Sequence, residues 1–247
     1  MDFVIALGWG LFGGSSLLVG AALGWLARPS ARVTAAVMAF GSGVLVSAIA
    51  FDLMDEALAT GGMAAAAAGF AAGAIGFTLG ALVLARAGAH GRKRSSDQKS
   101  AAAQAALAIA LGSVFDGIPE SIVIGLSLLD GEGVSLPIIA AIFLSNVPEG
   151  MSSAAGMKAS GLSKRYVFGL WSGIAVLCGL GSLAGFGLFR DAAPEYIAVT
   201  QGVAAGAMLA MIADTMIPEA FDEAHDAAGL ITAAGFLVAF VLSHLFG

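Results

Sequence analysis

The sequence predicts an all-α integral membrane protein, and three observations carry that prediction. Of the 247 residues, 59% are hydrophobic and only 11% are charged, whereas about 25% of the residues in a soluble domain are charged. The apolar residues form stretches of about 20 residues or more, the length of a membrane-spanning helix, and no alternation with a period of two suggests a β-barrel. The 35 glycines allow membrane helices to approach one another closely.

Eight membrane-spanning helices account for these apolar stretches. The segment DEALATGG (55–62) is all that separates the second span from the third. An acid near the start, in MDFVIALGWG, argues against a cleavable signal peptide, whose first region is basic, so we expect the first stretch to remain as a helix. The whole chain, 1–247, is then a single transmembrane domain, with spans at about 3–26, 33–54, 62–85, 101–129, 136–157, 167–189, 195–218 and 228–246.

The basic residues indicate an orientation. Ten of the eleven Lys and Arg residues follow odd-numbered spans, and Arg190 is the exception. The positive-inside rule then places those connections in the cytoplasm and both termini outside. We expect a multi-pass protein of the cell (inner) membrane with a flexible basic cytoplasmic loop at about 86–100. The ten residues are Arg28, Arg32, Arg86, Arg92, Lys93, Arg94, Lys99, Lys158, Lys164 and Arg165.

The fourth span carries two acids at membrane depth, in the stretch FDGIPESIVIG (115–125). Asp116 and Glu120 are four residues apart, and this spacing places both carboxyl groups on one face of a helix. Pro119 lies between them and has no N–H to donate. The carbonyl of Phe115 therefore loses its partner within the helix and needs another, from water, a side chain or an ion.

The fifth span repeats this pattern in FLSNVPEGMSSAAG (143–156). Ser145 and Glu149 have the same spacing, with Asn146 beside the serine. Pro148 precedes the acid and releases the carbonyl of Leu144. Two successive helices, both expected to be kinked by proline, thus offer carboxylate, hydroxyl, amide and carbonyl oxygens at the same membrane depth.

A cation site explains why such residues are found here. A charged side chain at mid-bilayer costs about 2.5–3.5 kcal/mol, and neither span contains a Lys or Arg to pair with the acids. The acids therefore bind a metal ion, carry protons, or do both in turn. The alternative is a set of protonated carboxyl groups that cross-link helices, and such contacts contribute only about 0.6 kcal/mol on average.

The paired P-E motifs resemble those of the ZIP (Zrt-, Irt-like protein) transporters of divalent metals, whose fourth and fifth helices typically carry H-N-x-P-E-G. FDLMDEAL (51–58) is similar to the family's H-L-L-P-E-A at the end of the second helix. AAGAMLAMIADTMIPEAFDEAH (204–225) is similar to the end of its seventh helix. The resemblance covers nearly the whole chain and implies eight helices in a ZIP-like bundle that takes up divalent cations.

The resemblance also implies a set of ligands. The first metal position falls on Asp116, Glu120, Ser145 and Glu149. A second, adjacent position falls on Gly117, Asn146, the shared Glu149 and a residue near Val176 of the sixth span. The sixth span has no acid, so we expect at most one strong site.

Departures from the family pattern bear on the metal. Asp116 and Ser145 stand where the family usually has histidine, or glutamine in the fifth helix, and Gly117 replaces an asparagine. Zinc, iron, copper and nickel favour imidazole, whereas manganese, magnesium and calcium favour carboxylate and carbonyl oxygens. The family resemblance therefore predicts Zn²⁺ as the transported ion, and the oxygen-rich donor set predicts Mn²⁺ or Fe²⁺ as alternatives.

Other acids are candidates for the ion pathway. Asp214 and Thr215 stand at the usual His-Glu positions of the seventh span, and Asp214 is expected to approach the main site on an exit or proton route. We expect the acids that end the second and seventh spans to lie at the outer surface, either attracting cations to a pore mouth or as solvated helix ends. They are Asp52, Asp55 and Glu56 in the second span, and Glu219, Asp222, Glu223 and Asp226, with His225, in the seventh.

Two other functions remain open. A proton-coupled carrier of another small solute could use the same carboxylates. An intramembrane hydrolase could use Asp52 and Asp116 as an aspartyl pair, or Ser42 as a nucleophile, although no histidine lies at mid-membrane to act as its base. The preferred hypothesis is a transporter of divalent cations that is not an enzyme and has no prosthetic group. Its partners are the divalent cation, the lipid bilayer and a second copy in a homodimer, with no nucleic acid.

Overall fold

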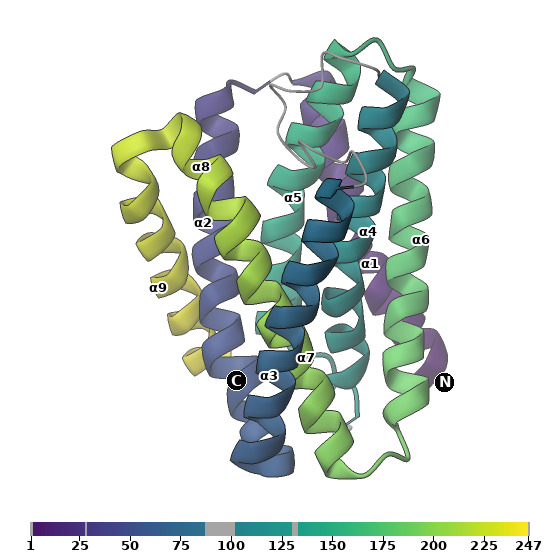
Figure 1. Ribbon diagram of the computed structural model, residues 1–247, viewed down its shortest axis with the longest axis vertical. Coiled ribbons are helices and arrows are strands. Elements are labelled where there is room, and N and C mark those ends of the chain that lie inside the picture. The colour runs from purple at the N-terminus through teal and green to yellow at the C-terminus, as the bar shows by residue number, and fades with distance from the viewer. Residues whose placement is uncertain (1, 28, 87–101, 130–132, 247) are drawn as a thin grey trace.

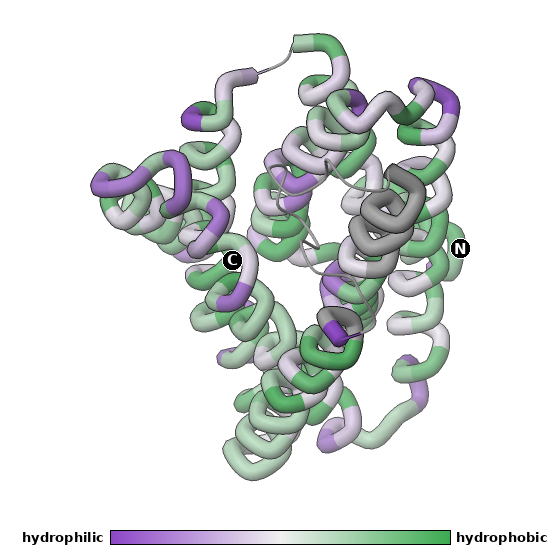
Figure 2. The backbone as a smooth tube through the Cα atoms, turned by 45° about the horizontal axis from the view of Figure 1, so that its top comes forward, coloured by the Kyte–Doolittle hydropathy of each residue, from purple (hydrophilic) through white to green (hydrophobic). Residues whose placement is uncertain are grey.

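A computed structural model describes residues 2–27, 29–86, 102–129 and 133–246. Within these ranges the chain is all-helical, with no strand (Figure 1). The basic loop expected at 86–100 lies, except for Arg86, outside the described residues. The helices are apolar along their lengths, and hydrophilic residues gather mainly at their ends (Figure 2). These properties fit a multi-pass membrane protein.

The helices occupy most of the ranges that the apolar stretches predicted, and the difference at residues 54–62 is treated below. Among the described residues, five helical segments are long and apolar enough to cross a membrane, and Ala31–Val83 and Pro194–Leu245, with 53 and 52 residues, are each longer than one crossing requires. The count of eight crossings and the side of the termini stay predictions. The α-helices are α1 Asp2–Leu26, α2 Ala31–Ala48, α3 Met54–Arg86, α4 Ala102–Leu126, α5 Leu136–Ala159, α6 Lys164–Phe189, α7 Pro194–Met211, α8 Ile217–Ala224 and α9 Ala228–Phe246.

The break between the second and third spans falls at Gly62, within the predicted connection 55–62, but it is shorter than expected, because the helix continues through most of that segment. The chain is helical from Met54, and its break is a single residue, Gly62, with φ 79° and ψ 172°. Only glycine adopts a positive φ of this kind without steric cost. The sequence located the turn only to 55–62 and not to the single residue Gly62, because the alanine-rich segments on both sides are strong helix formers.

Two π-helical turns interrupt the long helices. Ile49–Leu53 joins α2 to α3, and Ile212–Met216 joins α7 to α8. Each contains an acid that the sequence had singled out, Asp52 in the first and Asp214 in the second. Single π-helical turns inside α-helices are often found at functional sites. The proline-containing helices α4 and α5 instead continue across their prolines, and the bends predicted there stay predictions.

The helices pack in two sets. Helix α1 lies along both α5 and α6, and α4 packs on α6. In the second set α3 lies along α7, and α2 packs on α8 and α9. Figure 1 shows α8 and α9 at one flank and α6 at the other. The sets meet where α2 contacts α5 and α4 contacts α7, so the two motif helices, α4 and α5, form the first set's side of the boundary.

Glycines allow the backbones in each set to approach closely. A Cβ atom at Gly73 of α3 would overlap the carbonyl oxygen of Val203 in α7, and one at Gly206 would overlap that of Phe70 in the reverse direction. Small residues at helix interfaces allow this approach in membranes, where van der Waals contact drives helix association. Gly76 lies three residues further along α3 and has open space around it.

The α3–α7 contact gives a prediction with a matched control. Gly73→Val is expected to destabilise the protein by about 2 kcal/mol, because the new side chain must push the helices apart. Gly76→Val adds the same side chain to the same helix and should leave stability close to wild type. Thermal unfolding of the detergent-purified variants, followed by size-exclusion chromatography, measures the difference. Equal melting temperatures for the two variants would contradict this packing.

Candidate metal centre

The motif acids of α4 are buried inside the helical bundle. Asp116 and Glu120 are each only 3% exposed, whereas the other buried residues are mainly apolar, with serine the commonest polar one. They lie about one helical turn apart on the same face of α4. Ionisable residues are almost never fully buried without a function or a partner. Their burial is therefore the first structural indication of a functional site.

Helix α5 contributes the second half of the candidate site. Ser145 and Asn146 are buried, and Glu149 is 9% exposed. The hydroxyl of Ser145 donates to the carbonyl oxygen of Ile142 over 3.0 Å. A serine that donates its proton to its own helix keeps the lone pairs of its oxygen for a cation. All five residues that the sequence predicted as metal ligands are thus buried.

Helix α1 positions the α5 motif. A Cβ atom at Gly20 would overlap the carbonyl oxygen of Val147, and one at Gly150 would overlap that of Leu17. Gly20 of α1 lies against Val147, just before Pro148, and Gly150 directly follows Glu149. These two contacts with α1 therefore fix the depth of the Glu149 backbone. On the side of α2, a Cβ atom at Gly41 would lie 3.0 Å from the carbonyl oxygen of Leu144. The carbonyl that Pro148 releases therefore faces the α2 backbone.

Helix α6 positions the α4 motif in a similar way. A Cβ atom at Gly125 would overlap the carbonyl oxygen of Ser182, and one at Gly181 would lie 2.8 Å from Cβ of Ser121. Ser121 follows Glu120 and donates its hydroxyl to the carbonyl oxygen of Gly117 over 2.5 Å. The α4 motif is thus held against α6 through small residues on both helices.

Cys178 of α6 packs in an apolar cluster with Leu17 and Ile174, beside the α4 motif. It is 6% exposed, and its thiol interacts with Ser121 and electrostatically with the carboxyl groups of both Glu120 and Glu149. The sequence pointed instead to a position near Val176, whose side chain is 51% exposed on the outside of the bundle.

The site is not closed around a common point in this conformation. Among the described residues, no three Asp, Glu, His or Cys side chains stand close enough to hold a metal ion together. The hydroxyl oxygen of Ser145 and the amide oxygen of Asn146 are additional donor atoms, from residues of other types. The structure thus gathers buried donor groups on α4 and α5, and drawing them together around an ion requires movement of side chains or helices.

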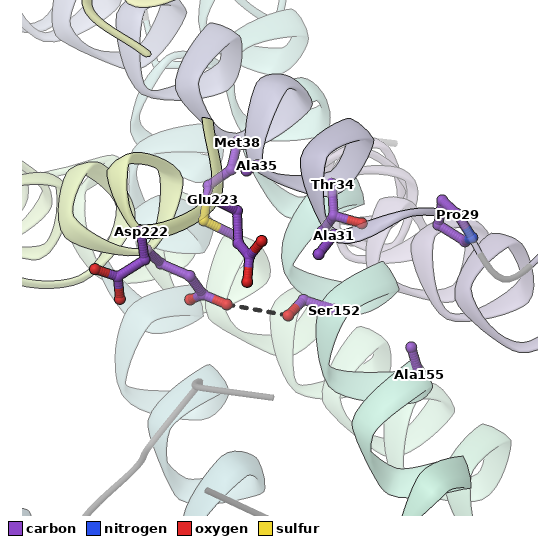
Figure 3. Close-up of a pocket in the computed structure, with 10 residues that line it drawn as sticks. Pro29, Ala31, Thr34, Ala35, Met38, Ser152, Ala155, Asp222 and Glu223 are labelled. Carbon is purple, nitrogen blue, oxygen red and sulfur yellow. Dashed lines mark hydrogen bonds between the residues drawn. The ribbon is translucent and has the colours of Figure 1, made fainter. Parts of the chain in front are cut away.

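A cavity of about 200 Å³ approaches this region from one end of the bundle (Figure 3). Ser152, one turn beyond Glu149 on α5, lines it and donates a hydrogen bond to Oε1 of Glu219 over 3.0 Å. Asp222 and Glu223 of α8 line the same cavity, together with Thr34 of α2. An acidic cavity therefore extends from the end of the bundle to within a turn of the candidate site.

Apolar side chains close the opposite side. Ile142, one turn before Ser145, packs with Val123, Leu45 and Met208 around a space of only about 10 Å³. These residues come from α2, α4, α5 and α7, which means that both helix sets contribute to the closure. The candidate site therefore has a polar approach from one end and an apolar barrier at the other.

The acids ending the second and seventh spans do not share a surface, which corrects the prediction that both lie outside. Glu219 lies with Pro29 and Ser152 at the end where α1 joins α2 and α5 ends. Asp52 lies at the other end, where it accepts a hydrogen bond from Ser243 near the C-terminus over 2.6 Å. The direction of the chain alternates with every span, so a seventh span that starts at the outer side must end at the side of the basic connections.

The remaining predicted acids lie away from the main site. Asp214 is exposed, in contrast to the buried acids of α4 and α5, so the structure does not bring it to the site as predicted. The extra residue of the π-helical turn at Ile212–Met216 changes the face on which it lies. Glu56 is half-buried in the first turn of α3, close to Asp52 in sequence.

Comparison with known proteins adds evidence from outside the structure. No family model matches the chain. It is similar to the zinc transporter ZIPB of Bordetella bronchiseptica, with 29% identity over 257 residues, and the alignment covers 98% of this chain and 83% of that protein. The similarity therefore extends over all of the helices described above.

Metal binding gives the test of the candidate centre. Glu120→Gln and Glu149→Gln keep side-chain volume but remove a negative charge, and each should weaken binding of Zn²⁺ or Mn²⁺ to the purified protein about tenfold or more. Glu195→Gln changes an exposed acid in the first turn of α7 and should bind as wild type. Isothermal titration calorimetry provides the affinities. Wild-type affinity in both motif variants would rule out these acids as ligands.

Proposed function

We propose that this chain is a divergent member of the ZIP family and that it carries divalent metal cations across the membrane by way of the buried donors of α4 and α5. One observation supports this most strongly. Asp116, Glu120 and Glu149 are buried in an apolar bundle, where a cation gives carboxylates a partner that the lipid cannot. The full-length similarity to a protein named as a zinc transporter agrees with this reading, as does the one-sided polar cavity.

The oxygen-rich donor set bears on which metal is carried. Asp116, Ser145 and Asn146 offer oxygen ligands and no imidazole, which favours Mn²⁺ or Fe²⁺ relative to a histidine site. The relative is named for zinc. We therefore propose Zn²⁺, Mn²⁺ or Fe²⁺ as the substrate class, with the metal a transported substrate and not a resident cofactor.

The proposed mechanism is alternating access. The two helix sets meet at the site, and in this conformation the cavity lined by Glu219 leads toward it from the end bearing the basic connections. That end is the cytoplasmic one if the positive-inside rule holds. Rocking of one set against the other would open the apolar barrier beside Ile142 and close the polar cavity. Uptake through the inner membrane is the proposed direction, and a homodimer stays a prediction.

An enzymatic role has less support. The hydrolase reading required Ser42 as a nucleophile or Asp52 with Asp116 as a pair. Ser42 is fully buried and donates its hydroxyl to Met38 of its own helix over 2.8 Å, and Asp52 accepts its hydrogen bond from Ser243. The similarity to a protein named as a zinc transporter argues in the same direction.

Transport in proteoliposomes tests the proposal. Glu120→Ala and Glu149→Ala should each abolish uptake of Zn²⁺ and Mn²⁺, because the remaining donors are too few to replace the hydration of the ion. Wild-type uptake should also fall in acidic buffer, since carboxylates must lose their protons to bind a metal. Glu195→Ala is the control. If both motif variants transport normally, the proposal fails; proton movement without metal would favour the carrier of another solute.

The identity of the residue at 116 should tune the choice of metal. Asp116→His replaces a carboxylate with an imidazole, which Zn²⁺ favours more than Mn²⁺ does. We expect the ratio of Zn²⁺ to Mn²⁺ uptake to rise about tenfold in this variant. Competition between the two ions in one proteoliposome preparation measures the ratio directly. An unchanged ratio would place Asp116 outside the coordination shell.

A further inference from the structure

We propose that a groove between α2, α5 and α9 binds a phospholipid of the phosphatidylethanolamine class, with an acyl chain in the groove and the ammonium of the headgroup at Asp52. The groove has a volume of about 260 Å³ and is lined by Asp52, at the end of the bundle opposite the acidic cavity. The inference goes beyond metal transport, and the binding does not depend on the proposed function.

Helix α2 forms the floor of the groove. It lies between α5 and α9 (Figure 1) and packs on both, whereas α5 and α9 contact one another little. Val44 and Ala48 of α2 are buried beneath the space that this leaves. The rims consist of apolar side chains that are more than a third exposed, so the groove is open along the side of the bundle that faces lipid. They are Leu136 and Leu144 of α5, and Val238 and Leu242 of α9.

The groove runs from the level of the lipid headgroups into the membrane. Asp52 accepts its hydrogen bond from Ser243, which lies close to the end of α9 at Phe246. The 19 residues of α9 extend over about 28 Å, close to the thickness of the hydrocarbon core, so this end of the helix lies near the headgroups. From Leu136, where α5 begins, to Leu144 is about 12 Å along the helix axis. An acyl chain thus fits with its head at Asp52 and its tail beside Leu144.

The walls of the groove suit a hydrocarbon chain. Apart from Asp52, every residue that lines the groove is Val, Leu, Ala or Pro. Apolar cavities do not hold water, and an acyl chain gains van der Waals contact on all three walls. A polar solute would instead lose its hydrogen bonds to water on entering. The bilayer supplies acyl chains at this depth, so a membrane lipid is the occupant that the groove fits.

Asp52 selects the headgroup by its charge. Ser243 donates to Oδ1 of Asp52 over 2.6 Å, and Oδ2 takes no hydrogen bond from the described residues. No Lys or Arg lines the groove. A primary ammonium offers a positive charge and three N–H donors to the free carboxylate oxygen. The carboxylate repels an anionic headgroup such as that of phosphatidylglycerol, and the methylated ammonium of phosphatidylcholine has no N–H to donate.

The bound chain contacts both helix sets. Helix α5 belongs to the first set, and α2 and α9 belong to the second. A ligand that binds only the folded arrangement stabilises it in proportion to its concentration. Phosphatidylethanolamine should therefore raise the melting temperature of the purified protein more than phosphatidylglycerol does.

Lipid retention by the wild-type protein is the first test and needs no variant. The full chain, purified in detergent, is incubated with equal amounts of dioleoyl phosphatidylethanolamine and dioleoyl phosphatidylglycerol and measured by native mass spectrometry. One phosphatidylethanolamine should be retained about fivefold over phosphatidylglycerol, the preference expected of one partly exposed ion pair. Equal retention of the two lipids, or a preference for the anionic one, would overturn the proposal.

Two pairs of variants locate the site. Asp52→Asn removes the charge and should bring the ratio of the two lipids close to one, whereas Asp55→Asn changes a nearby exposed acid and should keep the preference. Ala140→Phe fills the groove from α5 and should abolish retention of both lipids. Ala68→Phe makes the same change at an exposed position of α3 and should have no effect. Wild-type retention in both Asp52→Asn and Ala140→Phe would overturn the proposal.

A photoreactive phosphatidylethanolamine distinguishes the lipid from other occupants. With a diazirine in its acyl chain, it should label peptides of α5 and α9 that contain Leu144 or Val238, identified by mass spectrometry after digestion. Labels confined to other helices would overturn the proposal. A dimer that retains no lipid and dissociates in Ala140→Phe would also overturn it, because a second copy would then cover the groove. None of these measurements requires transport, so a failure of metal uptake bears on the proposed function alone.

Discussion

Carboxyl groups inside an apolar helical bundle are the constraint on which the rest of this structure depends. Each ionised acid at membrane depth costs a few kcal/mol, and the bundle retains Asp116, Glu120 and Glu149 at low exposure. The chain therefore has to supply these acids with partners, a route for ions and a barrier to leakage. Buried hydroxyl and amide groups, the acidic cavity and the apolar closure meet those three needs.

Close backbone packing is what makes such a site precise. The motif helices α4 and α5 contact one another little and are instead held by α6 and α1 through glycine and serine contacts. Each half of the site can therefore keep its own shape while the distance between the halves changes. This arrangement suits a site that must bind an ion firmly and then release it, because movement between packed units does not require either unit to deform.

Much of this could be predicted from the sequence, because the relevant signals are local. Apolar length located the helices, and the spacing of Asp116 and Glu120 placed them on one face. Gly62 and the two π-helical turns could not be predicted, because they depend on single dihedral angles in segments that otherwise favour helix. The π-helical turn also explains why Asp214 is exposed and does not reach the site, since one extra residue rotates everything that follows.

Other properties depend on which helices become neighbours, and one chain alone does not reveal that. The prediction that Glu219 lies at the outer surface was wrong, although counting the spans places it at the same end as the basic connections. The packing of Cys178 against Gly14 of α1, and of Ser121 against Gly181 of α6, becomes visible only when the helices are placed beside one another, because these residues are far apart in sequence.

The central claim is that a divalent ion binds between α4 and α5 at the buried acids. Anomalous X-ray scattering from crystals grown with Zn²⁺ tests it most directly, because the signal locates the metal without reference to activity. The account predicts a peak beside the carboxylates of Glu120 and Glu149, and its loss in Glu149→Gln. Peaks confined to the exposed acids at the helix ends, with none between α4 and α5, would contradict it.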